Sequence, residues 1–277
     1  MNTGICVKLR KESNISEDIR IAAENGFESC QIVSWDQSLR TETTADAILK
    51  ALKRTGIEIS ALWCGWDGPK LWDPVHGPGT SGLVPEQWRE IRIGNLCQGS
   101  DFAKMIGVRD VVTHMGFIPE SASDPLYPGF VSAAKKVAEY LKNNGQRLLF
   151  ESGQETPETL CRAITDIAAD NLGVNLDTGN LILYGKADPV AALDLIGKFV
   201  CNVHAKDGFY PEESGKLGKE TEIGSGKVDF KAFLKKLIQI GYDGPITIER
   251  ELGEKDMTNR IRRSAEYIRG IISEITH

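Results

Sequence analysis

The stretch GVNLDTGNLILYG, Gly173–Gly185, predicts a short buried strand that leads directly into a helix. Val174 and Leu176 form the apolar part of the strand, and Asp177 ends it. A carboxylate at the end of a buried strand needs a partner or a function, because an isolated buried charge costs free energy. The meaning of Asp177 therefore depends on whether other strands of the chain end in the same way.

The same order of elements recurs along the chain without a repeat in sequence. A short apolar run is followed by a loop, an amphipathic helix and a glycine that leads into the next run. A glycine accepts the left-handed backbone that often ends a helix, and we expect this at Gly26, Gly56, Gly107, Gly145 and Gly241. Capping residues predict helix starts at Ser16, Thr156, Asp188 and Asp229, and a proline follows Thr156 and Asp188.

Eight short apolar runs are candidate strands, and most of them lack the alternation of a half-exposed strand. They are Gly4–Leu9, Ser29–Val33, Ile57–Trp63, Val108–His114, Arg147–Glu151, Gly173–Asp177, Phe199–His204 and Pro245–Glu249. Eight parallel strands with helices between them predict an α/β fold, a single (β/α)8 TIM barrel over residues 1–277, with its active site at the C-terminal ends of the strands. A doubly wound open sheet is the alternative, but no glycine-rich phosphate loop follows the first strand.

The composition of the chain limits which binding partners and which cellular location are expected. The chain has 277 residues and a net charge of −6 without basic runs, which argues against a nucleic-acid or anionic membrane surface. No apolar run approaches the roughly 18 residues of a membrane-spanning helix, and the first residues lack the layout of a signal peptide. The six cysteines form no CxxC pair, so we expect reduced thiols in the cytoplasm.

Two long loops follow the third and seventh candidate strands, Cys64–Trp88 and Ala205–Val228. Long loops at the C-terminal face of a barrel are lids, pocket walls or tolerated surface insertions. The tryptophans in and around the first loop favour a pocket wall there; they are Trp63, Trp66, Trp72 and Trp88.

Four consecutive strands near the end of the chain finish in groups that can bind a metal ion. They are Glu151, Asp177, His204 and Glu249. Any one of them alone would be weak support, but the strand ends of a barrel converge on one mouth. Three carboxylates there repel one another unless a cation lies between them. One imidazole and three carboxylates suit one Mn²⁺, Mg²⁺ or Co²⁺ better than a structural thiolate zinc site.

The motifs FESGQETPETL, GVNLDTGN, NVHAKD, EIGSGKVDF and ITIERE resemble those of the sugar phosphate isomerase/epimerase family, the xylose isomerase-like TIM barrel superfamily. This superfamily also includes ketose 3-epimerases, inosose dehydratases and nucleases of the endonuclease IV type. The resemblance covers essentially the whole chain. It is specific for the superfamily and does not specify a substrate.

The resemblance implies a metal site, a reaction type and a substrate class. Glu151, Asp177, His204 and Glu249 would hold one divalent ion, most often Mn²⁺, with Mg²⁺, Co²⁺ or Zn²⁺ as the other choices. Glu151 and Glu249 would be the catalytic acid and base on opposite faces of a small carbohydrate. Family barrels often form homodimers or homotetramers, and nothing in this chain fixes the number.

The chemistry of such a site is that of a hydroxyketone bound to a divalent ion, whose C–H bond beside the carbonyl becomes acidic. Returning the proton gives an isomerase or epimerase, whereas loss of a β-substituent gives a dehydratase or lyase acting on a keto-sugar, cyclitol or keto-glycoside. Asn180 stands where many family members have a histidine, and the loop after the histidine strand has Lys206 and no arginine. Both departures argue against a simple free-ketose 3-epimerase.

Further residues at the predicted mouth are candidates for substrate binding. They are His114, Asn180, Lys206 and Trp66, with Trp35 and Trp72 able to stack on a sugar face or to belong to the core. Glu251 would face inward if the last strand continued. The backbone amides of EIGSGKV, Glu222–Val228, could receive an anion. We leave open whether the substrate is phosphorylated.

Two other classes of function are less consistent with the sequence. A nuclease of the endonuclease IV type needs about three metal ions and many histidines, but the chain has four histidines and is acidic. A non-catalytic barrel would be favoured by loss of one of the four predicted ligands, and all four are present.

Overall fold

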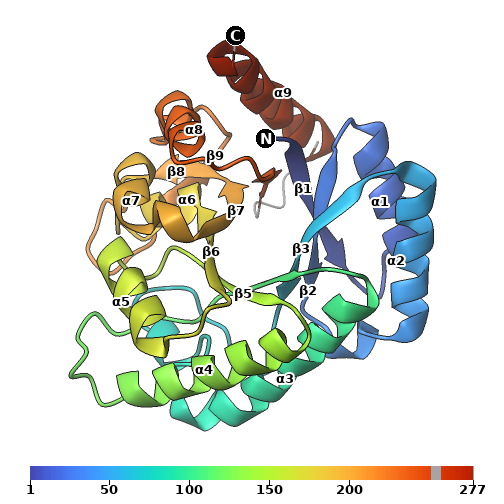
Figure 1. The fold of residues 1–277 in the computed structure, drawn as a ribbon. Helices are drawn as coiled ribbons and strands as arrows, with labels where there is room; N and C mark the ends of the chain where they lie inside the picture. The colour runs from blue at the N-terminus through green and yellow to red at the C-terminus, as the bar shows by residue number, and fades with distance from the viewer. Residues whose placement is uncertain (251–256, 277) are drawn as a thin grey trace.

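The computed structural model describes residues 1–250 and 257–276, and within them eight parallel strands close into a barrel. The helices surround the strands, and the N-terminus lies beside the last helix (Figure 1). The barrel strands are β1 (Thr3–Leu9), β2 (Ser29–Ser34), β3 (Glu58–Cys64), β4 (Asp110–Thr113), β5 (Arg147–Glu151), β6 (Leu172–Asp177), β7 (Val200–Ala205) and β10 (Ile246–Ile248).

The order of strands around the barrel is β1-β10-β7-β6-β5-β4-β3-β2, and every neighbouring pair is parallel. The last strand pairs with the first, with Thr3 opposite Ile246, so the sheet has no free edge. This closure confirms the (β/α)8 TIM barrel and excludes the doubly wound open sheet. All eight predicted strands are present, and β4 is shorter than the predicted Val108–His114.

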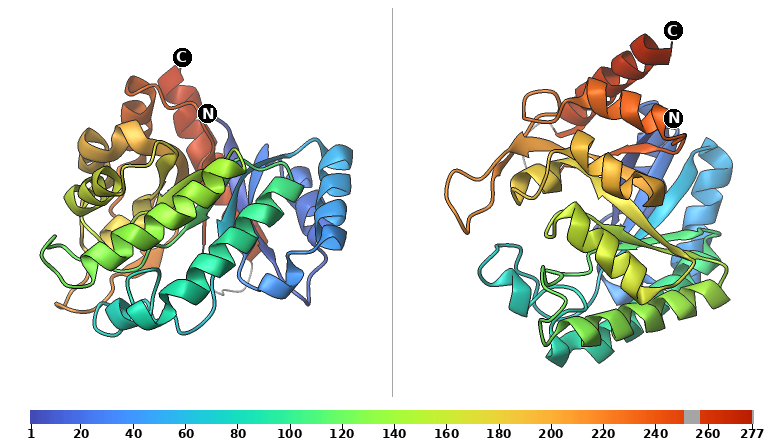
Figure 2. Two further views of the ribbon diagram at one scale, coloured as in Figure 1. Left: turned by 60° about the horizontal axis from the view of Figure 1, so that its bottom comes forward. Right: turned by 60° about the vertical axis from the view of Figure 1, so that its left-hand side comes forward.

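Each barrel strand is followed by at least one helix on the outside, and α3 and α4 pack side by side (Figure 2). Among the helices of the described ranges, none has both the length and the apolarity needed to cross a membrane. The helices are α1 (Ile15–Glu24), α2 (Glu42–Thr55), α3 (Glu86–Met105), α4 (Tyr127–Asn143), α5 (Pro157–Ile167), α6 (Thr178–Leu183), α7 (Pro189–Ile196), α8 (Phe230–Gln239) and α9 (Met257–Thr276).

Local chemistry at the helix ends is mostly as predicted. The five glycines expected after helices all adopt a left-handed backbone, with φ from 72° to 81°. Thr156, Asp188 and Asp229 cap helix N-termini through their side chains. The prediction of Ser16 as a cap is wrong, because the side chain of Asn14 accepts the backbone N–H of Ser16 at 3.1 Å and caps α1 instead.

The interior of the barrel is a packed core rather than a pore, as is usual for this fold. An inner layer of apolar side chains fills the lumen; its members are Val33, Ala61, Trp63, Val112 and Leu149. The C-terminal end of the lumen is polar, and the predicted metal ligands lie there.

The loop after β7 contains a two-stranded antiparallel sheet that was not predicted from the sequence. Its strands are β8 (Asp207–Phe209) and β9 (Lys219–Thr221). Each strand is only three residues long, which is too short for an alternation of apolar and polar residues to predict it.

The side chain of Asp207 organises the rest of this loop. Its carboxylate accepts the backbone N–H groups of Gly208, Gly224, Gly226 and Val228 at 2.8–3.1 Å. A Cβ atom at Gly226 would lie 2.2 Å from Asp207 Oδ1, so only glycine fits there. The prediction that the amides of this segment could receive an external anion is therefore wrong, because an internal carboxylate takes them.

Candidate active site

The four predicted metal ligands meet at the C-terminal mouth of the barrel. Glu151 and Asp177 are the last residues of β5 and β6, His204 lies in β7, and Glu249 follows β10 directly. One ligand atom from each lies within 4.8 Å of the others. Glu151, Asp177 and His204 are buried, and the side chain of Glu249 is 12% exposed. Strand order and register alone bring these groups together, since Asp177 lies opposite His204 and His204 opposite Thr247.

The ring of His204 is oriented from both sides. Its Nδ1 lies 2.8 Å from Glu151 Oε1, 3.4 Å from Glu249 Oε2 and 3.7 Å from Asp177 Oδ2. Its Nε2 lies 2.8 Å from Oε1 of Gln31, and the Gln31 amide group donates to Asn175 Oδ1 at 3.3 Å. Gln31 thus holds Nε2 as a donor and directs Nδ1 at the three carboxylates.

Gln31 was missed in the sequence analysis, although a signal for it exists. It is a fully buried amide in the middle of β2, between Cys30 and Ile32. A buried polar side chain inside an apolar strand needs hydrogen-bond partners, and here they are in the site.

Lys206 is buried among the same groups. Its Nζ lies 2.7 Å from Glu249 Oε2, 3.1 Å from Asp177 Oδ2 and 3.1 Å from Asn180 Oδ1. The backbone N–H of Asn180 also donates to Asp177 Oδ1 at 2.8 Å. Lys206 and Asn180 therefore contact the predicted ligands and each other, on the side of the cluster toward α6.

The second oxygen of Glu151 faces a different set of side chains. Glu151 Oε2 accepts a hydrogen bond from the indole of Trp63 and lies 3.2 Å from His114 Nε2. The other ring nitrogen of His114 is buried and has no hydrogen-bond partner among the described residues. His114 therefore lies against a predicted catalytic carboxylate.

The ionisation of the cluster favours a cation. Burial would raise the pKa of Glu249, but Lys206 and His204 hold it well below its ordinary value. Burial also opposes the effect of His114 and His204 on Glu151, whose pKa is nevertheless lowered. The pKa of Asp177 is raised by burial. Burial disfavours a charged His204, yet Glu249, Cys6 and Glu151 raise its pKa well above its ordinary value. The carboxylates thus attract positive charge to Nδ1, where a metal ion would replace the proton.

A cavity of about 200 Å³ opens beside Glu151 and Glu249. Aromatic rings form much of its wall, and two lysines complete it. The described residues that line it are Lys8, Val33, Trp35, Trp63, Lys70, Trp72, His114, Glu151 and Glu249.

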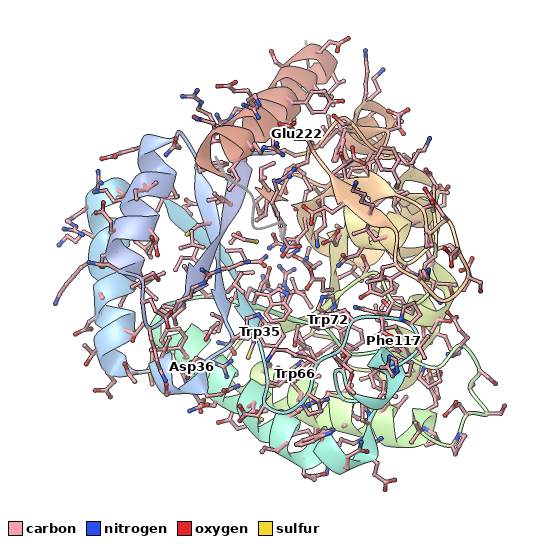
Figure 3. The ribbon with its side chains drawn as sticks, turned by 180° about the vertical axis from the view of Figure 1, so that it is seen from behind. Trp35, Asp36, Trp66, Trp72, Phe117 and Glu222 are labelled. Carbon is pink, nitrogen blue, oxygen red and sulfur yellow. The ribbon has the colours of Figure 1, made fainter. Side chains whose placement is uncertain are left out.

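Trp66 has a different place from its neighbours Trp35 and Trp72, although the three indoles lie together (Figure 3). Trp66 is 1% exposed and stacks 4.0 Å from the guanidinium of Arg92. It is not among the described residues that line the cavity, and the same holds for Asn180 and Lys206. Trp35 and Trp72 do line the cavity and are placed to meet a ligand, as is Trp63, whose indole N–H is bound to Glu151. Glu251 lies outside the described residues.

Comparison with known proteins places the chain in a family. The profile of the xylose isomerase-like TIM barrel matches residues 19–271. The chain belongs to this family. A structure of a xylose isomerase domain protein from Planctomyces limnophilus is 29% identical, with a TM-score of 0.91 over 99% of this chain and 98% of that one. An uncharacterized protein of Methanocaldococcus jannaschii, MJ1311, is 26% identical over 91% of this chain and 84% of its own length.

Enzymes are found among the other relatives of this xylose isomerase-like barrel. Inosose dehydratase of Lacticaseibacillus casei is 23% identical over 145 residues, which is 47% of this chain and 48% of that protein. The fold is also shared with 3-keto-D-glucoside 4-epimerase from E. coli, at 17% identity and a TM-score of 0.72, over 98% of this chain and 99% of that one. Epimerases and dehydratases therefore both occur on this barrel.

The residues of this xylose isomerase-like barrel fit a divalent metal ion. Ligands on opposite sides of a Mg²⁺ ion lie about 4 Å apart, which matches the spread of the four donor atoms. Three carboxylates and one imidazole are the donors that Mn²⁺ or Mg²⁺ accepts, and the imidazole already has its outer nitrogen bound by Gln31. A related barrel from Mycobacterium smegmatis, 18% identical over 95% of this chain and 89% of that one with a TM-score of 0.69, was solved in complex with magnesium.

Proposed function

We propose that the protein is a divalent-metal-dependent isomerase or epimerase of a small keto-sugar. The observation that carries the proposal is that Glu151 and Glu249 line one small cavity and also belong to the cluster of ligands. They come from β5 and from the end of β10, with β6 and β7 between them in the barrel. Two carboxylates therefore reach the cavity from different sides of the mouth, as a two-base proton transfer requires.

A divalent cation in the site would polarise a bound hydroxyketone and so acidify the C–H bond beside its carbonyl. One glutamate removes this proton, and the electron pair of the C–H bond passes into the C=C bond of an enediolate. The other glutamate returns a proton. Delivery to the opposite face of the same carbon gives epimerisation, and delivery to the neighbouring carbon gives isomerisation.

The surrounding residues support this chemistry. Trp63 and His114 fix one oxygen of Glu151, while Lys206 fixes Glu249. Ordered carboxylates keep their geometry through the reaction and lose little entropy when the substrate binds. Asn180 acts on the site through its hydrogen bond with Lys206, and Trp66 acts through its contact with Arg92, which holds the loop after β3. The groups placed to touch a sugar are His114, Trp35 and Trp72.

The expected metal is Mn²⁺, because the donors are mainly oxygen atoms and the single nitrogen is imidazole. The six cysteines are all free, which supports the proposal of a cytoplasmic enzyme. A homodimer or homotetramer and the absence of nucleic-acid or membrane partners stay predictions.

The test combines metal content with proton exchange. We expect about one divalent ion per chain in the purified protein and its loss in Glu249→Gln and His204→Ala. Incubation of a ketose panel with the Mn²⁺-loaded enzyme in D₂O should place deuterium at the carbon beside the carbonyl. Full activity of Glu151→Gln on the substrate found in this way would contradict the proposal, and so would an intact fold that binds no metal.

A lyase or dehydratase that uses the same site is the second candidate. His114 favours it, because an imidazole 3.2 Å from Glu151 and inside the cavity could protonate a departing hydroxyl or glycosyl oxygen. Asn180 in place of a histidine also separates the chain from the simple ketose epimerases. Product analysis decides between the two: a deuterated epimer supports the isomerase, and an unsaturated or cleaved product supports the lyase.

A further inference from the structure

Two lysines line the small cavity beside the candidate catalytic glutamates. Lys8 lies near the end of β1, two residues after Cys6, whose thiol is 3.9 Å from His204 Nε2. Alternate residues of a barrel strand face the lumen, so Lys8 faces the mouth as Cys6 faces the interior. Lys8 is also opposite Val33 in the register, and Val33 lines the same cavity.

Lys70 reaches the same cavity from a different element, the long loop after β3. Its ammonium group lies 4.5 Å from the ring of Trp35, which it meets in a cation–π contact. The carbonyl of the preceding Pro69 accepts a hydrogen bond from the buried Arg92 at 2.7 Å. Lys70 is thus attached to a fixed part of the loop and not to a free tip.

Neither lysine has an acidic partner in the described part of the chain. The carboxylates of the cavity are otherwise engaged, Glu151 with Trp63 and the two histidines, and Glu249 with Lys206 and His204. A cation within reach of a cavity and without a counter-ion is a place where an anionic ligand group gains most.

The charge balance of the site leads to the same conclusion. With a divalent ion bound, the charges of Glu151, Asp177 and Glu249 are compensated by that ion and by Lys206. Lys8 and Lys70 then remain as net positive charge at the cavity. A neutral sugar would leave both ammonium groups without an acidic partner, whereas a carboxylate or phosphate would pair with them.

We propose that the substrate is an anionic keto-sugar, with a carboxylate or phosphate group held by Lys8 and Lys70. This inference rests on the proposed function and narrows its substrate class. A cavity of about 200 Å³ has room for one sugar ring or chain, so the anionic group belongs to the reacting sugar itself and not to a distant second unit.

The test measures binding separately from catalysis. Trp35, Trp63 and Trp72 line the cavity, so quenching of intrinsic fluorescence reports occupancy. The Mn²⁺-loaded protein is titrated with D-fructose, D-fructose 6-phosphate and 5-keto-D-gluconate. We expect an anionic probe to bind at least about tenfold more tightly than D-fructose, with an affinity that falls as salt is added. Whichever of the two anionic probes binds more tightly shows whether the site prefers a phosphate or a carboxylate.

Lys8→Met and Lys70→Met should each reduce the preference for the anion about tenfold, and the double variant should abolish it. Lys136→Met is the matched control, because Lys136 is exposed on α4 and pairs with Glu90. Circular dichroism of each variant verifies folding. Equal affinity for D-fructose, no measurable binding of either anion, or a preference that survives in the double variant would overturn the inference.

The outcome also separates this inference from the proposed function. Anion binding that depends on both lysines, without deuterium exchange in any probe, would retain the anion site and count against the isomerase. Deuterium exchange into D-fructose at the rate seen with the anions would retain the isomerase and overturn the anionic substrate.

Discussion

At the level of single side chains, the candidate metal site depends on which nitrogen of His204 carries a proton. Gln31 Oε1 accepts from Nε2, which leaves the lone pair of a neutral ring on Nδ1, toward the carboxylates. We predict that Gln31→Met lowers the affinity for Mn²⁺ about 10- to 100-fold, because the ring loses the partner that fixes its tautomer. Isothermal titration calorimetry of the metal-free protein measures the change.

Gln31→Glu is the matched control for this prediction. A carboxylate at the same place still accepts the Nε2 proton, so the affinity for Mn²⁺ should stay within about tenfold of the wild-type value. If Gln31→Met bound Mn²⁺ as tightly as the wild type, the orientation of His204 would have to come from the carboxylates alone.

Glu155 offers a second prediction at this scale, on stability. It is 3% exposed in the segment after β5, and burial raises its pKa to about 8. The folded chain therefore retains this proton up to about pH 8, whereas the unfolded chain releases it above about pH 4.5. The carboxyl group thus makes folding progressively less favourable between these two pH values. We predict that Glu155→Gln is more stable than the wild type at pH 8, by up to about 4 kcal/mol, and nearly equal to it at pH 4.

Urea unfolding of both proteins at several pH values measures this difference. Glu139→Gln removes an exposed carboxyl group in the middle of α4 and should leave the free energy of unfolding nearly unchanged at every pH. A difference between Glu155→Gln and the wild type that does not grow with pH would show that the folded chain ionises Glu155 at its ordinary pKa.

At the level of elements, the loop after β3 is fixed from beneath by one side chain of α3. Arg92 is fully buried and stacks on Trp66. Burial lowers the pKa of Arg92 to about 10, so it remains charged at neutral pH. Its guanidinium donates to four backbone carbonyls of the loop at 2.7–3.0 Å, those of Asp67, Pro69, Thr80 and Gly82. The loop that carries Lys70 and Trp72 is therefore a fixed wall and not a mobile lid.

We predict that Arg92→Met destabilises the fold by about 3 kcal/mol, because four buried carbonyls lose their donor. Cleavage by trypsin after Lys70 should become faster, and binding of the anionic probe should weaken. The affinity for Mn²⁺ should not change, since no predicted ligand belongs to this loop. Arg54→Met, on the exposed side of α2, is the control and should alter none of these properties. Unchanged proteolysis at Lys70 in Arg92→Met would mean that other contacts hold the loop.

The elements differ in how far they could be predicted from sequence. Strands such as Arg147–Glu151 were predictable because both faces are buried, and helix ends such as Gly56 because the backbone chemistry is local. The β8–β9 sheet was not, because it depends on Asp207 bonding to amides 17 to 21 residues later. Trp66 is held away from the cavity by its stacking on Arg92, and Gln31 has a role in the site because it binds His204. Such pairs are far apart in sequence and meet only in the tertiary fold.

For the molecule as a whole, closure of the barrel converts four separate strand ends into one site. Neighbouring strands bring Glu151, Asp177 and His204 side by side, and β10 adds Glu249 because it pairs with both β7 and β1. The predicted convergence followed from the fold class alone, whereas the hydrogen bonds around the four groups depend on how the side chains pack in the folded chain. That residues 1–277 form a single domain stays a prediction.

The gathering of three carboxylates has a cost for the whole fold that a metal ion would remove. A cation that binds the folded chain and not the unfolded one stabilises it by about 2.7 kcal/mol at 100 times its dissociation constant. For a chain of this size we predict that Mn²⁺ at that concentration raises the melting temperature by roughly 5 °C and that a chelator reverses the change. Differential scanning fluorimetry measures both. His204→Ala should lose the shift, whereas His76→Ala should keep it, because His76 is an exposed residue that pairs with Asp73 and not with a predicted ligand. An equal shift in His204→Ala would assign the stabilisation to non-specific binding of Mn²⁺ and would leave the strand-end carboxylates without a role in holding metal.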